Sequence, residues 1–219
     1  MPSDIEIANL ALGNIRARSI QSFQEDSLEA QVCLQRYDQC RRFLLNTSVY
    51  NFARKVEPLA LLDIEPTEWI YAYQYPSDCL QAKHIVNGDY INADRTAVLR
   101  TEFEEYDRLR GYDMKTIPFE ISIIDGVKVI LTDYDEAYLS YIEDVTNTLL
   151  FDDQFIEAFQ WYLSAQIAVP IVGAEKGREM RKDALQMYEM TIKESTATNA
   201  NERGSRAPRE SDLTIERMS

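Results

Sequence analysis

The sequence predicts an α+β protein in which N- and C-terminal helices form a helical bundle, with a central, mostly antiparallel β region inserted between them and an extended C-terminal tail. Apolar residues recur at helical spacing near both ends, and short extended runs broken by turn residues fill the middle. We therefore divide the 219 residues into a helical part at 1–49, a β-rich insertion at 50–149, a second helical part at 150–194 and a tail at 195–219.

The first helical part contains two predicted helices. Ser3 and Glu6 have the spacing of a capping box, and a helix follows with one apolar face (Ile5, Ala8, Ala11, Leu12, Ile15). After the turn at 19–25, a long amphipathic helix over 26–46 is predicted to begin with a capping box of Asp26 and Glu29. Its apolar stripe is Ala30, Cys33, Tyr37, Cys40 and Leu44. We expect the two helices to form an antiparallel pair.

The β-rich insertion opens with aromatic residues at every second position (Trp69, Tyr71, Tyr73, Tyr75), which predicts a strand that ends at Pro76–Asp78. Residues 80–87 are expected to return antiparallel and to end in the turn Asn87–Gly88–Asp89. The polar stretch 90–111 has no clear period and is interpreted as a loop with one helical turn.

Residues 118–132 predict a β-hairpin around Asp125–Gly126. A two-residue loop would pair Ile124 with Val127 and mix polar and apolar side chains on both faces. A three-residue loop, 124–126, aligns apolar residues on one face, and because register follows the buried face we favour it, with Gly126 left-handed. A third strand is expected at 137–143.

Two helices are predicted in the second helical part. Asp152 or Asp153 caps a helix at about 154–169, which Pro170 and Gly173 are expected to stop. It is apolar nearly all round, with a thin polar edge (Glu157, Gln160, Ser164), so it lies either in the core or in a contact with another subunit. The last helix, about 175–193, carries Met180, Ala184, Met187 and Tyr188 at spacings of three and four.

The tail at 195–219 lacks a helical or strand period and is rich in Ser, Thr, Asn and Arg. Its charges balance, so the net charge of −14 lies on the rest of the chain. We expect the tail to bind a partner, through residues near its end (Arg206, Arg209, Leu213, Ile215, Arg217).

Composition limits the function classes. An excess of 37 acidic over 23 basic residues disfavours a protein that grips nucleic acid, because that affinity comes from Lys and Arg on phosphates. Such a charge suits a surface that DNA slides past, although solubility alone also explains it. Three cysteines do not indicate a disulfide framework, and Cys33 and Cys40 are interpreted as small core residues. Asp4 and Glu6 argue against a signal peptide, and the longest apolar run, 159–174, is expected to be too short to cross a membrane.

No catalytic residue, metal ligand set or cofactor motif is predicted. His84 is the single histidine, and the chain has neither a P-loop nor a G-x-G-x-x-G or G-x-S-x-G sequence. The acidic clusters (Asp133/Asp135/Glu136, Glu143/Asp144, Asp152/Asp153) do not fit an EF-hand loop and are interpreted as turns and helix caps. The tyrosines at 71, 73 and 75 are interpreted as sheet core rather than a stacking platform for bases.

A series of short matches connects the chain to a known family. Residues 7–55 resemble the pattern N-x-A-L-x-x-L/I-G-x-x-x-I-x-S, then E-x-S/T-x-x-A-x-x-C/A-x-x-x-Y-x-x-x-R, then aromatic-Asn-Phe-Ala. These elements fall at Asn9 to Gly13, Ile20 to Ser22, Glu25 to Arg41 and Tyr50 to Ala53. TDYDEAYLSYIEDV, an apolar helix ending Ala-Val-Pro and a Met-rich helix continue the series. The chain thereby resembles the head–tail adaptor (tail tubular protein A-like) family of short-tailed bacteriophages, although Tyr50 stands where the family often has Trp.

The resemblance implies a structural virion protein rather than an enzyme. Its subunits would form an adaptor ring, commonly dodecameric, between the portal protein and the tail nozzle protein, assembled in the host cytoplasm. Double-stranded DNA would pass through the ring without sequence-specific binding, and no membrane is involved. Two alternatives stay open: a monomeric interaction module with a partner-binding tail, and a metal-dependent nuclease that uses the acidic clusters.

Overall fold

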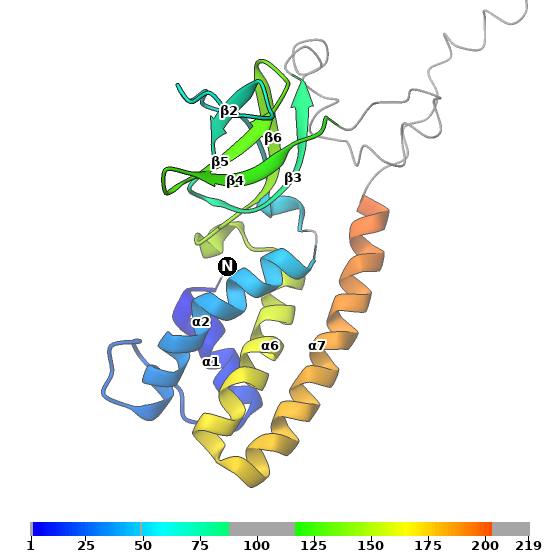
Figure 1. The fold of residues 1–219 in the computed structure, drawn as a ribbon. Helices are drawn as coiled ribbons and strands as arrows, with labels where there is room; N and C mark the ends of the chain where they lie inside the picture. Colours follow the sequence, from blue (N-terminus) through cyan, green and yellow to red (C-terminus); the bar gives the residue numbers. More distant parts are fainter. Residues whose placement is uncertain (1, 49, 88–116, 203–219) are drawn as a thin grey trace, which may run out of the picture.

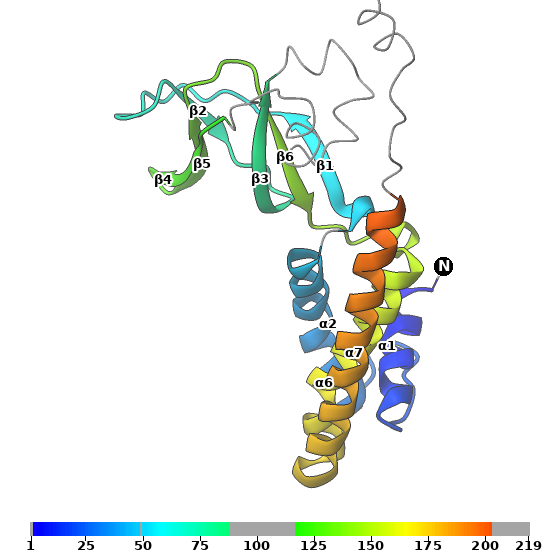
Figure 2. The same ribbon diagram turned by 90° about the vertical axis from the view of Figure 1, so that its right-hand side faces the viewer.

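The computed structural model describes residues 2–48, 50–87 and 117–202, and within them it is an α+β protein. Four α-helices form one end of the molecule and two small antiparallel sheets form the other (Figures 1 and 2). The helices are α1 (Asp4–Asn14), α2 (Leu28–Thr47), α6 (Asp153–Val172) and α7 (Ala174–Glu202). The predicted fold class, helices at both ends of the chain around an antiparallel β region, is confirmed.

Helix α6 is the central element of the bundle. It packs against α1, α2 and α7, whereas α1 and α2 touch each other only slightly. The expected α1–α2 pair is therefore held together mainly through α6. Of the two places left open for the apolar helix, the structure puts it in the core, with Phe155, Phe159, Leu163 and Ile167 fully buried.

Two predicted features of α6 are wrong. The helix runs through Pro170 and ends at Val172, where Gly173 adopts a φ of +96°. Proline in a last turn loses only one helical hydrogen bond, so it need not end the helix. Gln160 and Ser164 are not a polar edge but are buried, and Ser164 Oγ donates to the carbonyls of Gln160 (2.6 Å) and Ala11 (3.0 Å).

The complete α6 has 20 residues and is long and apolar enough to cross a membrane, unlike the shorter run expected from the sequence. However, 56% of its apolar window is buried inside the bundle. A core helix of a soluble protein passes the same length and composition test. The apolarity of α6 is thus accounted for by its three helical neighbours.

The N-terminal helices largely follow the predicted pattern. The capping box of Ser3 and Glu6 is present, and the apolar stripe of α2 is buried. The cap of α2 differs: Ser27, rather than Asp26, accepts a hydrogen bond from the backbone N–H of Ala30. Both residues are good caps, and Ser27 places the first turn one residue later.

Helix α7 extends to Glu202, so its predicted end near Lys193 is wrong. The prediction relied on an apolar stripe, which residues 195–202 lack. Once a helix is formed, each further residue adds a backbone hydrogen bond at low cost, so a polar stretch can continue it. The rest of the predicted tail, with Arg206, Arg209, Leu213, Ile215 and Arg217, lies outside the described residues.

The strands form two three-stranded sheets. Sheet A has the order β1 (Arg54–Pro58), β6 (Ala137–Glu143), β3 (Cys79–Asn87), and sheet B the order β2 (Tyr71–Gln74), β5 (Val127–Thr132), β4 (Glu120–Ile124). The strand at 80–87 does not return onto β2 as expected; β3 pairs with β6 in the other sheet. The predicted turn at Asn87–Asp89 and loop at 90–111 lie outside the described residues, apart from the backbone of Asn87.

The β4–β5 hairpin has a two-residue loop, so the favoured three-residue register is wrong. Ile124 pairs with Val127 and Glu120 with Leu131. The prediction assumed one buried face, but sheet B packs apolar residues on both sides: Ile130 faces the core shared with sheet A, and Val129 and Leu131 face a second cluster. Asp125 and Gly126 both have positive φ, as a type I′ turn requires, so turn chemistry sets the register.

A close approach between α6 and α7 gives a first testable prediction. A Cβ built on Gly177 would lie 2.8 Å from Ala168 O and 2.8 Å from Val169 Cα, whereas a Cβ on Gly13 would meet nothing within 4 Å. We expect Gly177→Ala to lower the free energy of unfolding by about 1–3 kcal/mol, as overpacking does, despite the better helix propensity of alanine. Gly13→Ala is the control and should be neutral or stabilising in the same urea titration. Equal effects of the two changes would contradict the close contact.

Candidate functional site: the joint between bundle and sheets

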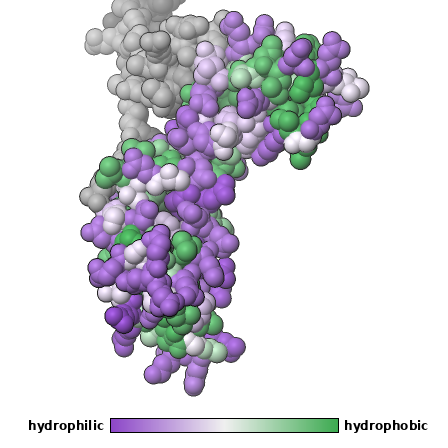
Figure 3. All heavy atoms as spheres, turned by 90° about the vertical axis from the view of Figure 1, so that its left-hand side faces the viewer, coloured by the Kyte–Doolittle hydropathy of each residue, from purple (hydrophilic) through white to green (hydrophobic). Residues whose placement is uncertain are grey.

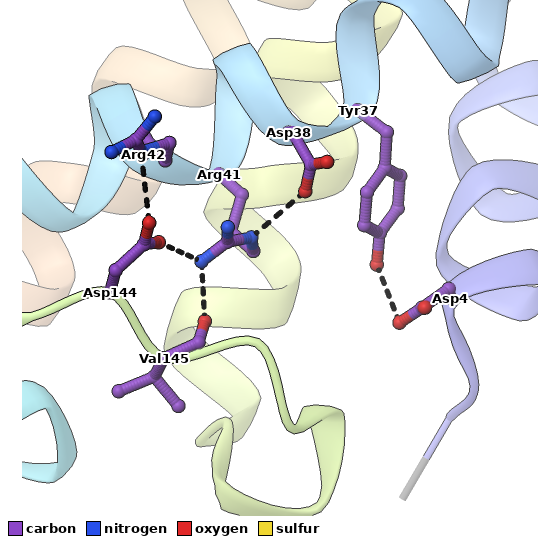
Figure 4. Close-up of polar contacts among 7 residues, drawn as sticks. All are labelled: Asp4, Tyr37, Asp38, Arg41, Arg42, Asp144 and Val145. Carbon is purple, nitrogen blue, oxygen red and sulfur yellow. Dashed lines mark hydrogen bonds and ion pairs between the residues drawn. The ribbon is translucent and has the colours of Figure 1, made fainter. Parts of the chain in front are cut away.

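The most tightly bonded polar group in the structure lies where the bundle meets the sheets. Arg41 on α2 is 3% exposed, and its Nη1 donates to Asp144 Oδ1 (2.6 Å) and to the carbonyl of Val145 (2.6 Å). Its Nε contacts Asp38 Oδ1 at 3.3 Å. Figure 4 shows the guanidinium of Arg41 pointing from α2 towards the segment that leaves β6. Arg41 therefore ties the bundle directly to the strand that centres sheet A.

Asp144 is held from several directions. Arg42 Nε lies 3.0 Å from Asp144 Oδ2, so two arginines of α2 share one carboxylate (Figure 4). The backbone N–H of Asp144 donates to the carbonyl of Asp78 beside β3 (2.7 Å). A buried arginine is tolerated only when its charge is paired and its N–H groups are bonded. These contacts meet that requirement and fix the exit of β6 against both α2 and β3.

Other residues of the family-like pattern hold segments of the bundle together. Asn9 donates to the carbonyl of Ile20 (2.9 Å) and accepts from its N–H (2.8 Å), which clamps the loop between α1 and α2. Tyr37, one turn before Arg41, donates to Asp4 at 3.3 Å (Figure 4) and packs on Phe159 with ring centroids 4.8 Å apart. These motif residues hold segments together, and none lines a deep pocket.

A second charged cluster stiffens sheet A. Lys55 Nζ on β1 lies 2.6 Å from Asp78 and 3.1 Å from Glu57, and the hydroxyl of Tyr141 is within 2.9 Å of both carboxylates. The hydrogen bond that Lys55 donates to Asp78 raises the pKa of Lys55 above its ordinary value. Partial burial alone would raise the pKa of Asp78, but its bonds to Lys55 and Tyr141 outweigh that effect and lower it. Both groups stay charged near neutral pH, which suits a structural cross-link.

The acidic clusters have structural partners in the described residues. Asp133 accepts from the N–H of Ile70 (3.1 Å), Asp135 from the N–H of Glu136 (2.9 Å), and Asp152 caps α6 through the N–H of Phe155 (2.6 Å). Within residues 2–48, 50–87 and 117–193, no group of three or more His, Cys, Asp or Glu side chains is placed to hold a metal ion. The interpretation of the carboxylates as turns and caps holds for Asp133, Asp135 and Asp152, but it is wrong for Glu143, which ends β6, and for Asp144, which pairs with Arg41 and Arg42.

The remaining candidates from the sequence lie in the core. Tyr73 is buried between the sheets and donates to the carbonyl of Tyr134 (2.9 Å), with Tyr71 and Tyr75 packed beside it. This confirms the interpretation of the tyrosines as sheet core. Cys33 and Cys40 are buried, and burial raises the pKa of each thiol to about 12, as expected of small core residues rather than reactive thiols. His84 lies on β3 opposite Ser140.

The excess negative charge is concentrated in the β region. Residues 50–149 hold 19 acidic and 9 basic residues, so they carry −10 of the total −14. Exposed apolar side chains occur in the same region, including Ile70, Ile121, Ile123 and Val127. Figure 3 shows hydrophobic atoms among hydrophilic ones at this end of the molecule. A surface that mixes charge with exposed apolar residues is a candidate for contact with another protein.

The sequence identified the helices that carry the joint but not its key contact. Arg41 closes the family-like pattern, yet no role was assigned to it. A usable signal was present, because Tyr37, Arg41 and Leu45 are spaced by four on one face of α2, and two of these are core residues. The partner-binding residues expected in the tail (Arg206, Arg209, Leu213, Ile215, Arg217) lie outside the described residues.

Comparison with known proteins adds no name to this geometry. No protein-family model matches the chain, and no curated protein matches it.

The joint gives a second prediction. Replacing Arg41 with Met should lower the free energy of unfolding by about 3 kcal/mol, the lower end for breaking a buried ion pair, because Arg42 still partners Asp144. Arg42→Met is the matched control: its side chain is 56% exposed, so a loss of at most about 1 kcal/mol is expected. Chemical denaturation followed by circular dichroism measures both. If the two variants lose the same stability, the joint does not depend on Arg41.

Proposed function

We propose that the chain is a structural virion protein: a subunit of an adaptor ring that joins the portal to the tail nozzle of a short-tailed phage and lines the DNA channel. The observation that carries the proposal is the ordered pattern from Asn9 to Ala53, which resembles the head–tail adaptor family. The dodecameric ring, the portal and the nozzle come from that resemblance.

The role of the pattern residues supports the proposal. Asn9 clamps the first loop, Tyr37 joins α1, α2 and α6, and Arg41 ties α2 to the exit of β6. A subunit whose function is to transmit contact between two neighbours needs this kind of internal bracing. A catalytic site would instead need convergent reactive groups in a cleft, with perturbed pKa values.

The charge distribution is compatible with a DNA channel. An acidic wall repels phosphate and so keeps passing DNA from sticking, and screening limits the effect to about 8 Å at physiological salt. With 19 acidic residues, the β region is the part best suited to such a wall. Because few of its charges are basic, strong sequence-independent binding of DNA is not expected there.

A closed ring requires two different complementary faces on each subunit. The sequence suggested the apolar helix at 154–169 and the tail as these faces. Helix α6 cannot serve as a main contact surface, because its apolar residues are buried against α1, α2 and α7. We therefore expect the two contact faces of a ring subunit on the outer side of the bundle and on the sheets.

Attachment to portal particles tests the proposed function. Because α7 continues to Glu202, the truncation that removes the tail without cutting a helix deletes residues 203–219. We expect the truncated chain to fold as the full chain does and to bind tail-less portal particles more weakly, because the tail is the proposed portal contact. Co-sedimentation of protein with particles measures the binding.

Full-length protein is the positive control, and particles without portal are the negative control. If the truncated chain binds portal particles as tightly as the full chain does, the tail is not part of the interface. Failure of the full chain to bind portal particles at all would contradict the adaptor role itself.

A further inference from the structure

The outer face of α7 has no partner among the major packing contacts of the described chain, since this helix packs chiefly on α6. Arg178, Arg181 and Lys182 are exposed on this face around the half-buried Leu185. They line a shallow hollow of about 380 Å³, which Gln186 and Glu189 complete. We call this surface, residues 178, 181, 182 and 185, the basic strip.

A surface of opposite charge lies at a corner of sheet B, where β2 begins. Ile70 is 65% exposed there, and its N–H donates to Asp133 (3.1 Å). Trp69 Nε1 bonds Glu120 at 3.3 Å, and Glu68 is two residues before Ile70 and exposed. We call Glu68, Ile70, Glu120 and Asp133 the acidic corner. It combines one exposed apolar residue with three carboxylates, as the basic strip combines Leu185 with three cations.

We propose that the acidic corner of one copy docks on the basic strip of a second copy of this chain. The three carboxylates of the acidic corner match the three cations of the basic strip, and Ile70 and Leu185 are the apolar centres of the two surfaces. Complementary charges at an interface fix register and speed association, while apolar burial supplies non-directional attraction. The described part of sheet B has eight exposed acidic residues and one lysine over 59–75 and 118–136, so it offers little competing positive charge.

A single chain cannot make this contact with itself. Sheet B lies at one end of the molecule, and the corner where α6 joins α7 lies at the other (Figures 1 and 2). The basic strip begins four residues after α7 starts, near that far end. Two unlike surfaces at opposite ends give a heterologous contact, which builds a ring when the rotation between copies closes and an open filament when it does not. The inference deepens the proposed ring and rests on that function, yet it needs no portal to be tested.

A charge-swap experiment tests the pairing. One variant reverses the corner (Glu68→Lys, Glu120→Lys), and the other reverses the strip (Arg181→Glu, Lys182→Glu). Each variant alone places like charges opposite each other, so self-association should be lost. An equimolar mixture restores the contacts. The reversed corner of one variant then meets the reversed strip of the other, and the unaltered strip of the first meets the unaltered corner of the second. Sedimentation velocity at low ionic strength measures the assembly, and Lys83→Glu with Lys176→Glu is the charge-matched control for the strip.

The expected result is that the full chain and the control associate, that each swap variant is monomeric and that the mixture associates again. Association of the full chain should weaken as salt is raised. A monomeric full chain, a swap variant that still associates, or a mixture that stays monomeric would overturn the docking. None of these results decides attachment to the portal, which the particle assay measures separately.

Discussion

The buried guanidinium of Arg41 is the constraint on which the arrangement of the molecule depends. Arg41 is 3% exposed, and a buried charge is tolerated only when it is paired and its N–H groups are hydrogen-bonded. Its partners come from α2 and from the segment that follows β6. Separating the bundle from the sheets would leave that charge without Asp144 and the Val145 carbonyl. The ion pair adds to the apolar contact at the joint, where Ile142 of β6 packs in the core of the bundle, and so couples the bundle to the smaller core of the sheets.

This coupling gives the elongated molecule a defined geometry. The helices share one large core centred on α6, and the sheets share a smaller one around Tyr73, Ile130 and Leu139. Small cores of this kind add limited stability by themselves. The Lys55–Asp78 cross-link strengthens sheet A, and the Arg41 joint strengthens the link between sheet A and the bundle. A subunit built in this way can hold a surface at each end at a fixed separation, which is what the proposed adaptor role requires.

The parts of the fold predicted correctly are those that depend on local physics. The buried stripe of α2, the Ser3–Glu6 cap and the strand at 137–143 each follow from the spacing of side chains within one segment. The wrong predictions depend on partners elsewhere in the chain. The hairpin register was inferred from one buried face, but the segment that covers Val129 and Leu131 gives sheet B a second one. Likewise, β3 pairs with β6, which lies far along the sequence.

The joint could be predicted only in part for the same reason, because its partners lie far apart in the sequence. The spacing of Tyr37, Arg41 and Leu45 places an arginine on the buried face of α2, but nothing near it in sequence indicates the carboxylate that pairs with it. Asp144 is more than a hundred residues away, inside an acidic run interpreted as a turn. The acidic corner was missed for a similar reason, because Ile70, Glu120 and Asp133 come together only through the sheet.

The central claim is that bundle and sheets form one rigid body held by Arg41. The most direct test is a distance distribution between spin labels on exposed Gln186 of α7 and Lys128 of β5, in a chain whose half-buried Cys79 is replaced by Ser. Double electron–electron resonance should give a single narrow distribution, which broadens when Arg41 is replaced by Met. A broad distribution in the chain that retains Arg41 would contradict the account.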